Sequence, residues 1–325
     1  MSKVDFSKFK DIPTLGFHSY GDTVVDMSYH EKWKVPDKIL IQIAPVGLFF
    51  MRDQNPYQPY TVDEIIKESI ESVEAGAAAV HVHVREEDGS ASDDRQATET
   101  VIKALRDRFG ADVFIDGEAL MGPDLETMME PITRNYYESA AVSCWADFMG
   151  DSLCYLPPPT CKAMAEVLQA YGKKIILAAY NPGDIDNAYR WLIKPGIVKP
   201  PFFWGLTPGM PGASPMYDPI GMAETLIHMI RRIRDIDDCE DSIIQVCQSG
   251  RASSYLSTLA ILLGCHIRIG KEDTTVKVPH KDDNIVSCRE VVEQHVTIAR
   301  LLGREPMTAV EYRKVLGLPP FKGSF

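Results

Sequence analysis

The chain has 325 residues, of which 45% are hydrophobic, and its formal net charge is −12. This length and composition allow one large domain with a buried core. The acidic excess argues against a nucleic-acid-binding surface, and no apolar run approaches the roughly 20 residues needed to cross a bilayer.

The seven cysteines include no Cys-x-x-Cys pair. Their spacing resembles neither a disulfide framework nor a thiolate zinc site. The N-terminal residues contain no apolar core of a signal peptide. We therefore expect a cytoplasmic protein with reduced cysteines that interacts with neither membranes nor nucleic acid.

Residues 1–36 read as an irregular N-terminal extension, and residues 37–325 read as one catalytic domain in which strands and helices alternate. Strands are predicted at residues 38–44, 77–85, 113–116, 140–143, 174–180, 202–206, 242–247 and 266–270. Helices are predicted at residues 62–75, 97–109, 123–130, 159–171, 185–192, 219–233, 252–263, 284–302 and 308–315.

This alternation implies parallel strands joined by helical crossovers. Eight such units in a chain of this length predict an α/β protein with a closed (β/α)8 barrel, the TIM barrel. An open doubly wound sheet is the alternative, but no Gly-x-Gly-x-x-Gly follows the first strand. In a barrel the active site is built at the carboxyl ends of the strands.

Two histidines stand at the end of the second predicted strand, in the run His81-Val82-His83. Alternate side chains of a strand point to the same face, so the two imidazoles are expected to lie together. Two imidazoles and one carboxylate with open coordination positions are a common catalytic zinc set. The same pair could also be packed core residues, and it needs a third ligand from elsewhere in the chain.

The last predicted strand carries Arg268, and Glu272 and Asp273 follow it. An arginine on a buried strand needs a carboxylate partner or an anionic ligand. Arg268 can orient a substrate carboxylate through two hydrogen bonds, and Asp273 can serve as a general base. A structural salt bridge and solvated loop acids are the alternatives, and these patterns leave open which acid would bind a metal.

A turn of Ser249, Gly250 and Arg251 follows the seventh strand and precedes a helix. Free backbone N–H groups in such a turn can hold phosphate. The three residues are therefore a candidate contact for a phosphate group, although the glycine can equally be an ordinary loop residue without a binding role.

Two segments are typical of a known family. Residues 73–89 read Val-Glu-Ala-Gly-Ala-Ala-Ala-Val-His-Val-His-Val-Arg-Glu-Glu-Asp-Gly, and residues 264–273 read Gly-Cys-His-Ile-Arg-Ile-Gly-Lys-Glu-Asp. A Gly-x-Pro-Gly pattern at 209–212 and the Ser-Gly-Arg turn lie between them. Over roughly residues 38–305 the chain resembles the β-keto acid cleavage enzyme family, which includes the 3-keto-5-aminohexanoate cleavage enzyme.

The resemblance implies a (β/α)8 barrel that forms a homotetramer and holds one Zn²⁺ per subunit. It implies that His81, His83 and Glu272 bind the zinc and that Arg268 and Asp273 are catalytic. The implied reaction is a Claisen-type exchange, in which a β-keto acid and acetyl-CoA give acetoacetate and a new acyl-CoA. The Ser-Gly-Arg turn then becomes a candidate contact for the CoA phosphates.

The chain departs from the family pattern at several strand ends. Asp116-Gly117-Glu118 replaces a Ser-x-Gly-Gly-type turn, and Ala141 falls where the family has threonine. Phe49 or Phe50 falls where the aminohexanoate enzyme has the glutamate that meets the substrate amine, and Tyr180 replaces a glutamate-rich strand end. These departures disfavour an amino-substituted substrate and favour a less polar side group.

Two other functions are compatible with the same residues. One is a different metal-dependent barrel enzyme, such as a hydrolase or an aldolase, which would act on a keto acid without CoA. The other is a metal-containing barrel without catalytic activity that binds a ligand or regulates a partner. The combination of Arg268 with Asp273 favours keto acid cleavage over the first of these, and the lost polar groups after the third and fourth strands leave the second open.

Overall fold

The computed structural model describes residues 3–12, 27–214, 216–236, 239 and 242–322. The chain divides into two units, Met1–Lys34 and Val35–Phe325. In the first unit, the described residues include a 3₁₀ helix, η1 (Phe6–Phe9), which the Asp5 side chain caps. Among the described residues, no helix has the length and apolar character needed to span a membrane.

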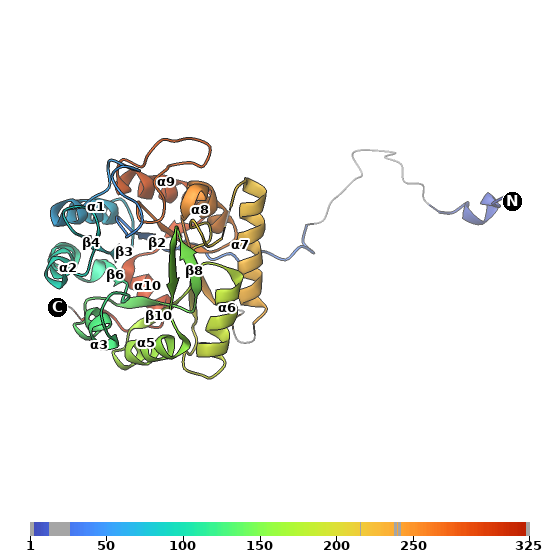
Figure 1. Cartoon of the computed structure of the whole chain (residues 1–325). Coiled ribbons are helices and arrows are strands. Elements are labelled where there is room, and N and C mark those ends of the chain that lie inside the picture. Colours follow the sequence, from blue (N-terminus) through green and yellow to red (C-terminus); the bar gives the residue numbers. More distant parts are fainter. Residues whose placement is uncertain (1–2, 13–26, 215, 237–238, 240–241, 323–325) are drawn as a thin grey trace. The chain divides into compact units, whose positions relative to one another are not determined.

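The second unit is a closed barrel of eight parallel strands, as the sequence predicts, and Figure 1 shows its helices arranged around the strands. The strands follow one another around the barrel in chain order. They are β2 (Ile41–Ile43), β3 (Ala79–Val82), β6 (Phe114–Gly117), β7 (Ser139–Ser143), β10 (Lys174–Ala179), β11 (Phe203–Leu206), β12 (Ile243–Cys247) and β13 (His266–Ile269). The last strand pairs with the first, with Ile269 opposite Ile43.

The helices lie at the predicted places. They are α1 (Val62–Glu74), α2 (Arg95–Phe109), α3 (Leu125–Met128), α4 (Glu130–Thr133), α5 (Pro158–Ala170), α6 (Pro182–Ala188), α7 (Pro219–Arg234), α8 (Ser253–Leu262), α9 (Cys288–Leu301) and α10 (Ala309–Val315). Helix α1 begins at the predicted capping box, in which Thr61 and Glu64 satisfy each other's backbone N–H groups. Several other boundaries differ from the prediction for local reasons.

Helix α9 begins four residues later than predicted, because Ser287 forms a capping box with Glu290. Helix α6 begins three residues earlier, because Asn181 caps it and Pro182 suits the first helical position. It continues into a π-helical turn, η4 (Tyr189–Ile193). The helix predicted at 123–130 is two short helices that meet at Met129.

Within the described part of the chain, three pairs of short strands lie outside the barrel. Strands β1 (Lys38–Ile39) and β14 (Glu305–Pro306) pair in parallel, and β4 (Val84–Arg85) and β5 (Ala91–Ser92) form a hairpin. The predicted strand 77–85 is therefore interrupted at His83, because β4 turns away to pair with β5.

A second hairpin, β8 (Ala146–Met149) and β9 (Ser152–Tyr155), follows β7 and was not predicted. Its connection is Gly150-Asp151, and Gly150 adopts a φ of 59°. A glycine-containing two-residue loop of this kind is a recognised signal for a tight hairpin. The insertion places two strands at the carboxyl end of the barrel, where Figure 1 shows β8 in front of the barrel strands.

The opposite end of the barrel is filled by apolar side chains and covered by α10. The Tyr312 ring is buried and packs edge-on against Phe114, with centroids 4.7 Å apart, and against Phe203 at 6.1 Å. Leu40, Ile176 and Met307 belong to the same cluster. This packing closes the amino-terminal end of the barrel and leaves the carboxyl end as the place for a site.

A buried ion pair ties the loop after β13 to α1. The Lys271 side chain is fully buried, and its Nζ donates to Glu68 Oε1 at 2.8 Å and to the Tyr57 carbonyl at 2.7 Å. Glu68 Oε2 accepts the backbone N–H of Cys288 at 2.7 Å. Lys271 and Glu68 thus connect the loop that carries residues 272 and 273 with the middle of α1 and the start of α9.

Replacing Lys271 with alanine is expected to lower the free energy of unfolding by about 3–5 kcal/mol, because Glu68 would lose its buried cationic partner. Lys277→Ala is the control, since Lys277 forms a half-exposed pair with Glu290 at 2.9 Å and its loss should cost less than about 1 kcal/mol. Urea denaturation followed by circular dichroism measures both. Equal losses in the two variants would contradict the anchoring role of Lys271.

Candidate active site

His81 and His83 meet at the carboxyl end of β3. Their Nε2 atoms lie 3.0 Å apart, and their ring centroids lie 4.8 Å apart at an angle of 65°. His81 is buried and His83 nearly so. The strand geometry predicted this common direction, and Val82 between them is buried on the other side of the strand.

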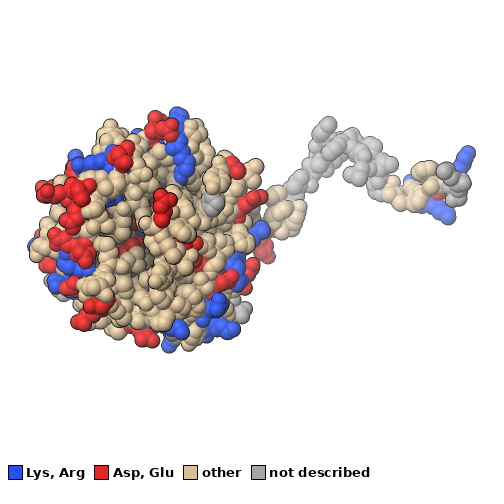
Figure 2. Space-filling model, in the orientation of Figure 1, with Lys and Arg blue, Asp and Glu red and all other residues tan. Residues whose placement is uncertain are grey.

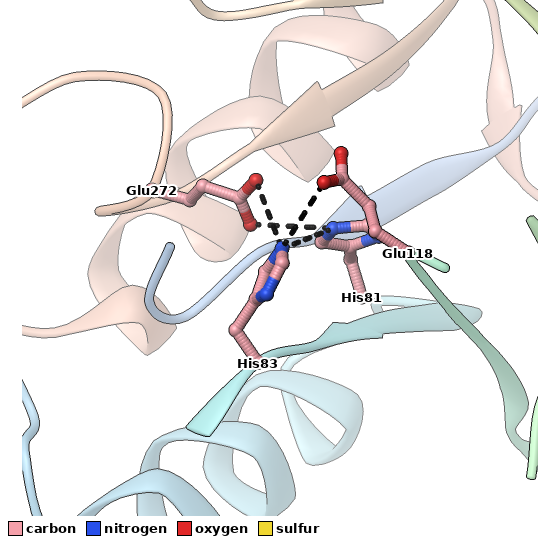
Figure 3. A group of neighbouring side chains, drawn as sticks. All are labelled: His81, His83, Glu118 and Glu272. Carbon is pink, nitrogen blue, oxygen red and sulfur yellow. Dashed lines mark hydrogen bonds and ion pairs between the residues drawn. The ribbon is translucent and has the colours of Figure 1, made fainter. Parts of the chain in front are cut away.

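Two carboxylates complete the group. Glu272 Oε2 lies 3.5 Å from His81 Nε2, and Glu272 Oε1 lies 3.6 Å from His83 Nε2. Glu118 Oε2 lies 4.0 Å from His83 Nε2. One ligand atom from each of the four residues lies within 4.8 Å of all the others, and Figure 3 shows the four side chains converging on one point.

The His81 ring is oriented from behind by Asp116. Its Nδ1 lies 3.1 Å from Asp116 Oδ1, and the same oxygen accepts a hydrogen bond from Gln42 Nε2. Histidines that bind metals usually carry such a partner, which fixes the ring and leaves the other nitrogen for the metal. Asp116 therefore leaves Nε2 of His81 directed at His83 and Glu272.

The surroundings of His81 favour a positive charge on or beside the ring. Burial lowers the pKa of His81, but the carboxylates of Glu272 and Asp116 outweigh burial and raise this pKa to about 9. Burial tends to raise the pKa of Glu272, yet Arg268 and the two histidines hold it well below its usual range. An ionised Glu272 beside two imidazoles is a suitable place for a cation.

The donor set fits a divalent metal. Glu272 Oε2 is buried and has no hydrogen-bond partner among the described residues, although a buried carboxylate oxygen normally has one. Asp116 contacts His81, Glu118 lies beside His83, and Arg268 pairs with Glu272 and Asp273. These four carboxylates outnumber Arg268 and the one histidine whose pKa is raised, so negative charge is in excess. Two imidazoles with carboxylates suit Zn²⁺, and the same set can also hold Fe²⁺.

Two glycines allow the close backbone approach that places Glu272. A Cβ atom on Gly47 would lie 2.0 Å from Glu272 Cγ. Gly270 has a φ of 134°, and a Cβ atom there would lie 2.2 Å from the Ala44 carbonyl oxygen. The backbone after β2 and the turn after β13 can therefore approach each other only because both positions lack a side chain.

Arg268 holds the two acids that follow it. Its Nε donates to Asp273 Oδ2 at 3.0 Å, and its Nη2 donates to Asp273 Oδ1 at 2.5 Å and to Glu272 Oε1 at 3.1 Å. This is the bidentate geometry that arginine forms with a carboxylate. Burial raises the pKa of Asp273, although Arg268 opposes the rise.

A cavity of about 360 Å³ lies beside these residues. Arg268, Glu272, Asp273 and Glu118 line one part of it, and apolar and aromatic side chains line the rest. The cavity therefore brings together a candidate metal group, an arginine that can meet an anion and a carboxylate that can accept a proton. Small-molecule sites commonly combine an apolar wall with a few convergent polar groups in this way.

The predicted phosphate turn lies next to the site. The backbone N–H of Ser249 donates to the Cys247 carbonyl at 2.8 Å, and that of Gly250 donates to the Asp273 carbonyl at 2.8 Å. Neither N–H is therefore free in this structure, contrary to the expectation from the sequence. The Arg251 side chain is half exposed and pairs with Asp282 at 2.6 Å.

The structure brings together the predicted residues His81, His83, Glu272, Arg268 and Asp273. From the sequence, Glu118 was expected only as part of an atypical turn and not as a member of the candidate metal group. Its position directly after the third barrel strand could have indicated this role, since the carboxyl ends of neighbouring parallel strands lie at the same end of a barrel.

The structure also contains a stacked pair of rings, Trp145 and Tyr180, that was not predicted.

The model of the β-keto acid cleavage enzyme family matches residues 38–318. A 3-keto-5-aminohexanoate cleavage enzyme from Fusobacterium nucleatum is 31% identical over 288 residues, which cover 87% of this chain and 98% of that protein. A 3-dehydrocarnitine:acetyl-CoA trimethylamine transferase from Rhizobium meliloti is 23% identical over 307 residues, which cover 86% and 97% of the two chains.

Solved structures with this fold include the binary complex of ObcA with oxaloacetate. It aligns with a TM-score of 0.67 and 20% sequence identity, over 81% of this chain and 68% of that chain. At this identity the likeness concerns the fold alone, and it agrees with the closed barrel described above.

Gly47→Ala is expected to weaken metal binding by at least about tenfold, because the added methyl group would displace the Glu272 side chain. Gly221→Ala is the matched control, since a Cβ atom there would meet only Asp218 at 3.4 Å. Titration with Zn²⁺ against a chelating indicator measures the affinity. Unchanged affinity in Gly47→Ala would contradict the role of Glu272 as a ligand.

Proposed function

The chain belongs to the β-keto acid cleavage enzyme family, and we propose that it uses zinc to convert a β-keto acid and acetyl-CoA into acetoacetate and a new acyl-CoA. Family membership makes the protein an enzyme of β-keto acid cleavage with acyl transfer from acetyl-CoA. One observation supports the proposed zinc-dependent exchange that gives acetoacetate. At one cavity, the group of His81, His83 and Glu272 lies beside Arg268 and Asp273.

His81, His83 and Glu272 would hold the zinc, and Glu118 is close enough to serve as a further ligand or to bind a metal-bound water. When bound, Zn²⁺ supplies Lewis-acid stabilisation of the negative charge that develops on the keto and carboxylate oxygens, an effect worth several kcal/mol. The reaction needs no redox change, which favours zinc over iron among the metals that this donor set suits.

Arg268 is placed to orient the substrate carboxylate. Its Nε and Nη2 atoms are engaged with Asp273 and Glu272, whereas its Nη1 has no hydrogen bond within the described part of the chain. The guanidinium lines the cavity, so Nη1 can donate to an anionic oxygen there. One arginine thus connects the proposed base, a proposed ligand and the substrate.

Asp273 is the proposed general base. It is buried, lines the cavity, and is held in a fixed orientation by the bidentate contact with Arg268. In this role its carboxylate takes a proton from C2 of the β-keto acid. A base that is already fixed within reach of C2 avoids the entropic cost of orientation in this proton transfer.

The bonds then exchange in two steps. C2 of the substrate forms a bond to the carbonyl carbon of acetyl-CoA, and CoA leaves as a thiolate. The thiolate attacks C3 of the original acid, the C2–C3 bond breaks, and the electron pair remains on the acetoacetate fragment. Asp273 returns the proton to that fragment, so the enzyme is restored and the new acyl-CoA carries the original C3 carbonyl.

The Ser249-Gly250-Arg251 turn is proposed to meet a CoA phosphate through Arg251. The exposed ion pair of Arg251 with Asp282 is worth at most about 1 kcal/mol, so a phosphate can replace the carboxylate. Ser249 and Gly250 would set the position of Arg251 through their backbone contacts. A homotetramer, implied by the family resemblance, stays a prediction.

The main competing function is a metal-dependent hydrolase or aldolase that acts on the same acid without CoA. Membership in an acyl-transfer family argues against it, and the same membership argues against a barrel without catalytic activity. The two chemistries differ in where the atoms of acetyl-CoA appear in the products.

Incubation of the enzyme with a panel of 3-oxo acids and acetyl-CoA labelled with ¹³C in the acetyl group tests the reaction. We expect the label at C3 and C4 of acetoacetate and an unlabelled new acyl-CoA, both identified by mass spectrometry. Product formation that is independent of acetyl-CoA would favour the hydrolase or aldolase instead.

Asp273→Asn is expected to retain zinc but to lose turnover by about 10²–10⁴-fold, because the amide cannot accept the C2 proton. Enzyme-catalysed deuterium exchange at C2, measured by NMR without acetyl-CoA, should fall in parallel. Asp107→Asn is the control, since Asp107 forms an exposed pair with Lys103. Wild-type exchange in Asp273→Asn would exclude this residue as the base.

A further inference from the structure

We propose that the group attached to C3 of the β-keto acid is uncharged and apolar, an alkyl or aromatic tail, and that the loop after β2 and the β8–β9 hairpin select it. This inference rests on the proposed acyl exchange and specifies its substrate class.

The charges in the cavity are confined to one part of it. Four lining residues are charged, and all four belong to the group described above: Glu118, Arg268, Glu272 and Asp273. The other eleven are Leu48, Phe49, Leu120, Trp145, Leu153, Cys154, Tyr155, Leu156, Tyr180, Thr207 and Met210. The part of the cavity that remains for the tail therefore offers no unused charge among the described residues.

Two stacked aromatic rings form part of the apolar wall of the cavity. The rings of Trp145 and Tyr180 stack with centroids 4.5 Å apart and an interplanar angle of 18°. Trp145 is buried in a cluster with Met149 and Met210, and Cys154 packs against the cluster. Met149 and Cys154 belong to β8 and β9, so the hairpin forms part of the wall as well as the entrance.

The entrance carries exposed apolar side chains. Leu153 and Tyr155 are 59% and 62% exposed, and Phe49 is 42% exposed. Figure 2 shows that the middle of the face that carries the hairpin is mostly uncharged, with lysines, arginines and acids mainly around its edge. Apolar surface at the mouth of a cavity is a favourable place for an apolar ligand group.

The loop that carries Phe49 is fixed by a buried arginine. Arg85 Nη2 donates to the Phe50 carbonyl at 2.8 Å, and its Nη1 donates to the Gly89 carbonyl at 2.7 Å. Arg85 does not line the cavity. Its guanidinium therefore supports the apolar wall from behind and is not available to a charged tail.

Charged tails lack a partner in this arrangement. A carboxylate would meet Arg268, but that guanidinium binds Asp273 and Glu272, and its remaining Nη1 is assigned to the C1 carboxylate of the substrate. An ammonium group would meet Glu118, which belongs to the candidate metal group. A charge taken out of water without a new partner is strongly disfavoured, whereas each buried methylene group favours binding.

The test compares 3-oxo acids of matched length in the holoenzyme assay with ¹³C-labelled acetyl-CoA. For n-alkyl tails we expect kcat/KM to rise about fourfold per added methylene until the cavity is full. Analogues that end in a carboxylate or an ammonium group should be at least about 100-fold poorer than the alkyl acid of the same length.

Phe49→Lys is expected to improve kcat/KM for the carboxylate-tailed acid at least about tenfold and to lower it for the alkyl acid, because the new ammonium group would face the tail. Leu153→Lys, at a more exposed position of the same cavity, should act in the same direction. The control is Phe148→Lys, since Phe148 is 52% exposed on the same hairpin but does not line the cavity. It should leave the order of substrates unchanged.

The outcomes separate the two proposals. Exchange with alkyl or aromatic acids in preference to charged ones, reversed by Phe49→Lys or Leu153→Lys, supports the inference. Exchange confined to charged tails overturns the inference and leaves the proposed reaction standing. Absence of labelled acetoacetate with every acid, from enzyme loaded with zinc, overturns the proposed function and this inference together.

Discussion

The hydrogen bonds between β13 and β2 are the interaction on which the site depends. They close the barrel, with Ile267 opposite Ile41 and Ile269 opposite Ile43. Closure brings the turn after the last strand beside the second barrel strand, which carries the histidines. Glu272 then lies within 3.6 Å of both imidazoles. An open sheet would leave its first and last strands apart, so the ring of strands is a requirement of the chemistry and not only of stability.

Bringing four acidic side chains together costs electrostatic free energy, and the surrounding structure holds these side chains in place. Like charges repel in a buried site, and Asp116, Glu118, Glu272 and Asp273 all carry acid groups. Arg268 offsets part of this charge through its contacts with two of them, and a divalent cation would offset more. The positions are maintained by Lys271, which anchors the loop to α1, and by Gly47, which leaves room for Glu272.

The two ends of the barrel differ in role: the amino-terminal end completes the core, and the carboxyl end carries the cavity. At the amino-terminal end, Tyr312 of α10 packs on Phe114 and Phe203 and completes the core. At the carboxyl end, the loops are free to vary because they contribute less to that core. The β8–β9 hairpin is such an addition, and it contributes apolar residues to the wall of the cavity. The proposed substrate preference thus resides in loops, whereas the proposed reaction resides in residues at strand ends.

The sequence by itself determined the eight strands, the helices and the pairing of His81 with His83, because periodicity and capping act between residues close in the chain. It also placed Arg268 within reach of Asp273, five positions away. Only the tertiary structure decided that Glu118 joins the candidate metal group, that the N–H groups of Ser249 and Gly250 are occupied, and that the hairpin reaches the cavity. Each of these depends on contacts between segments far apart in the chain, which barrel closure creates and local patterns do not contain.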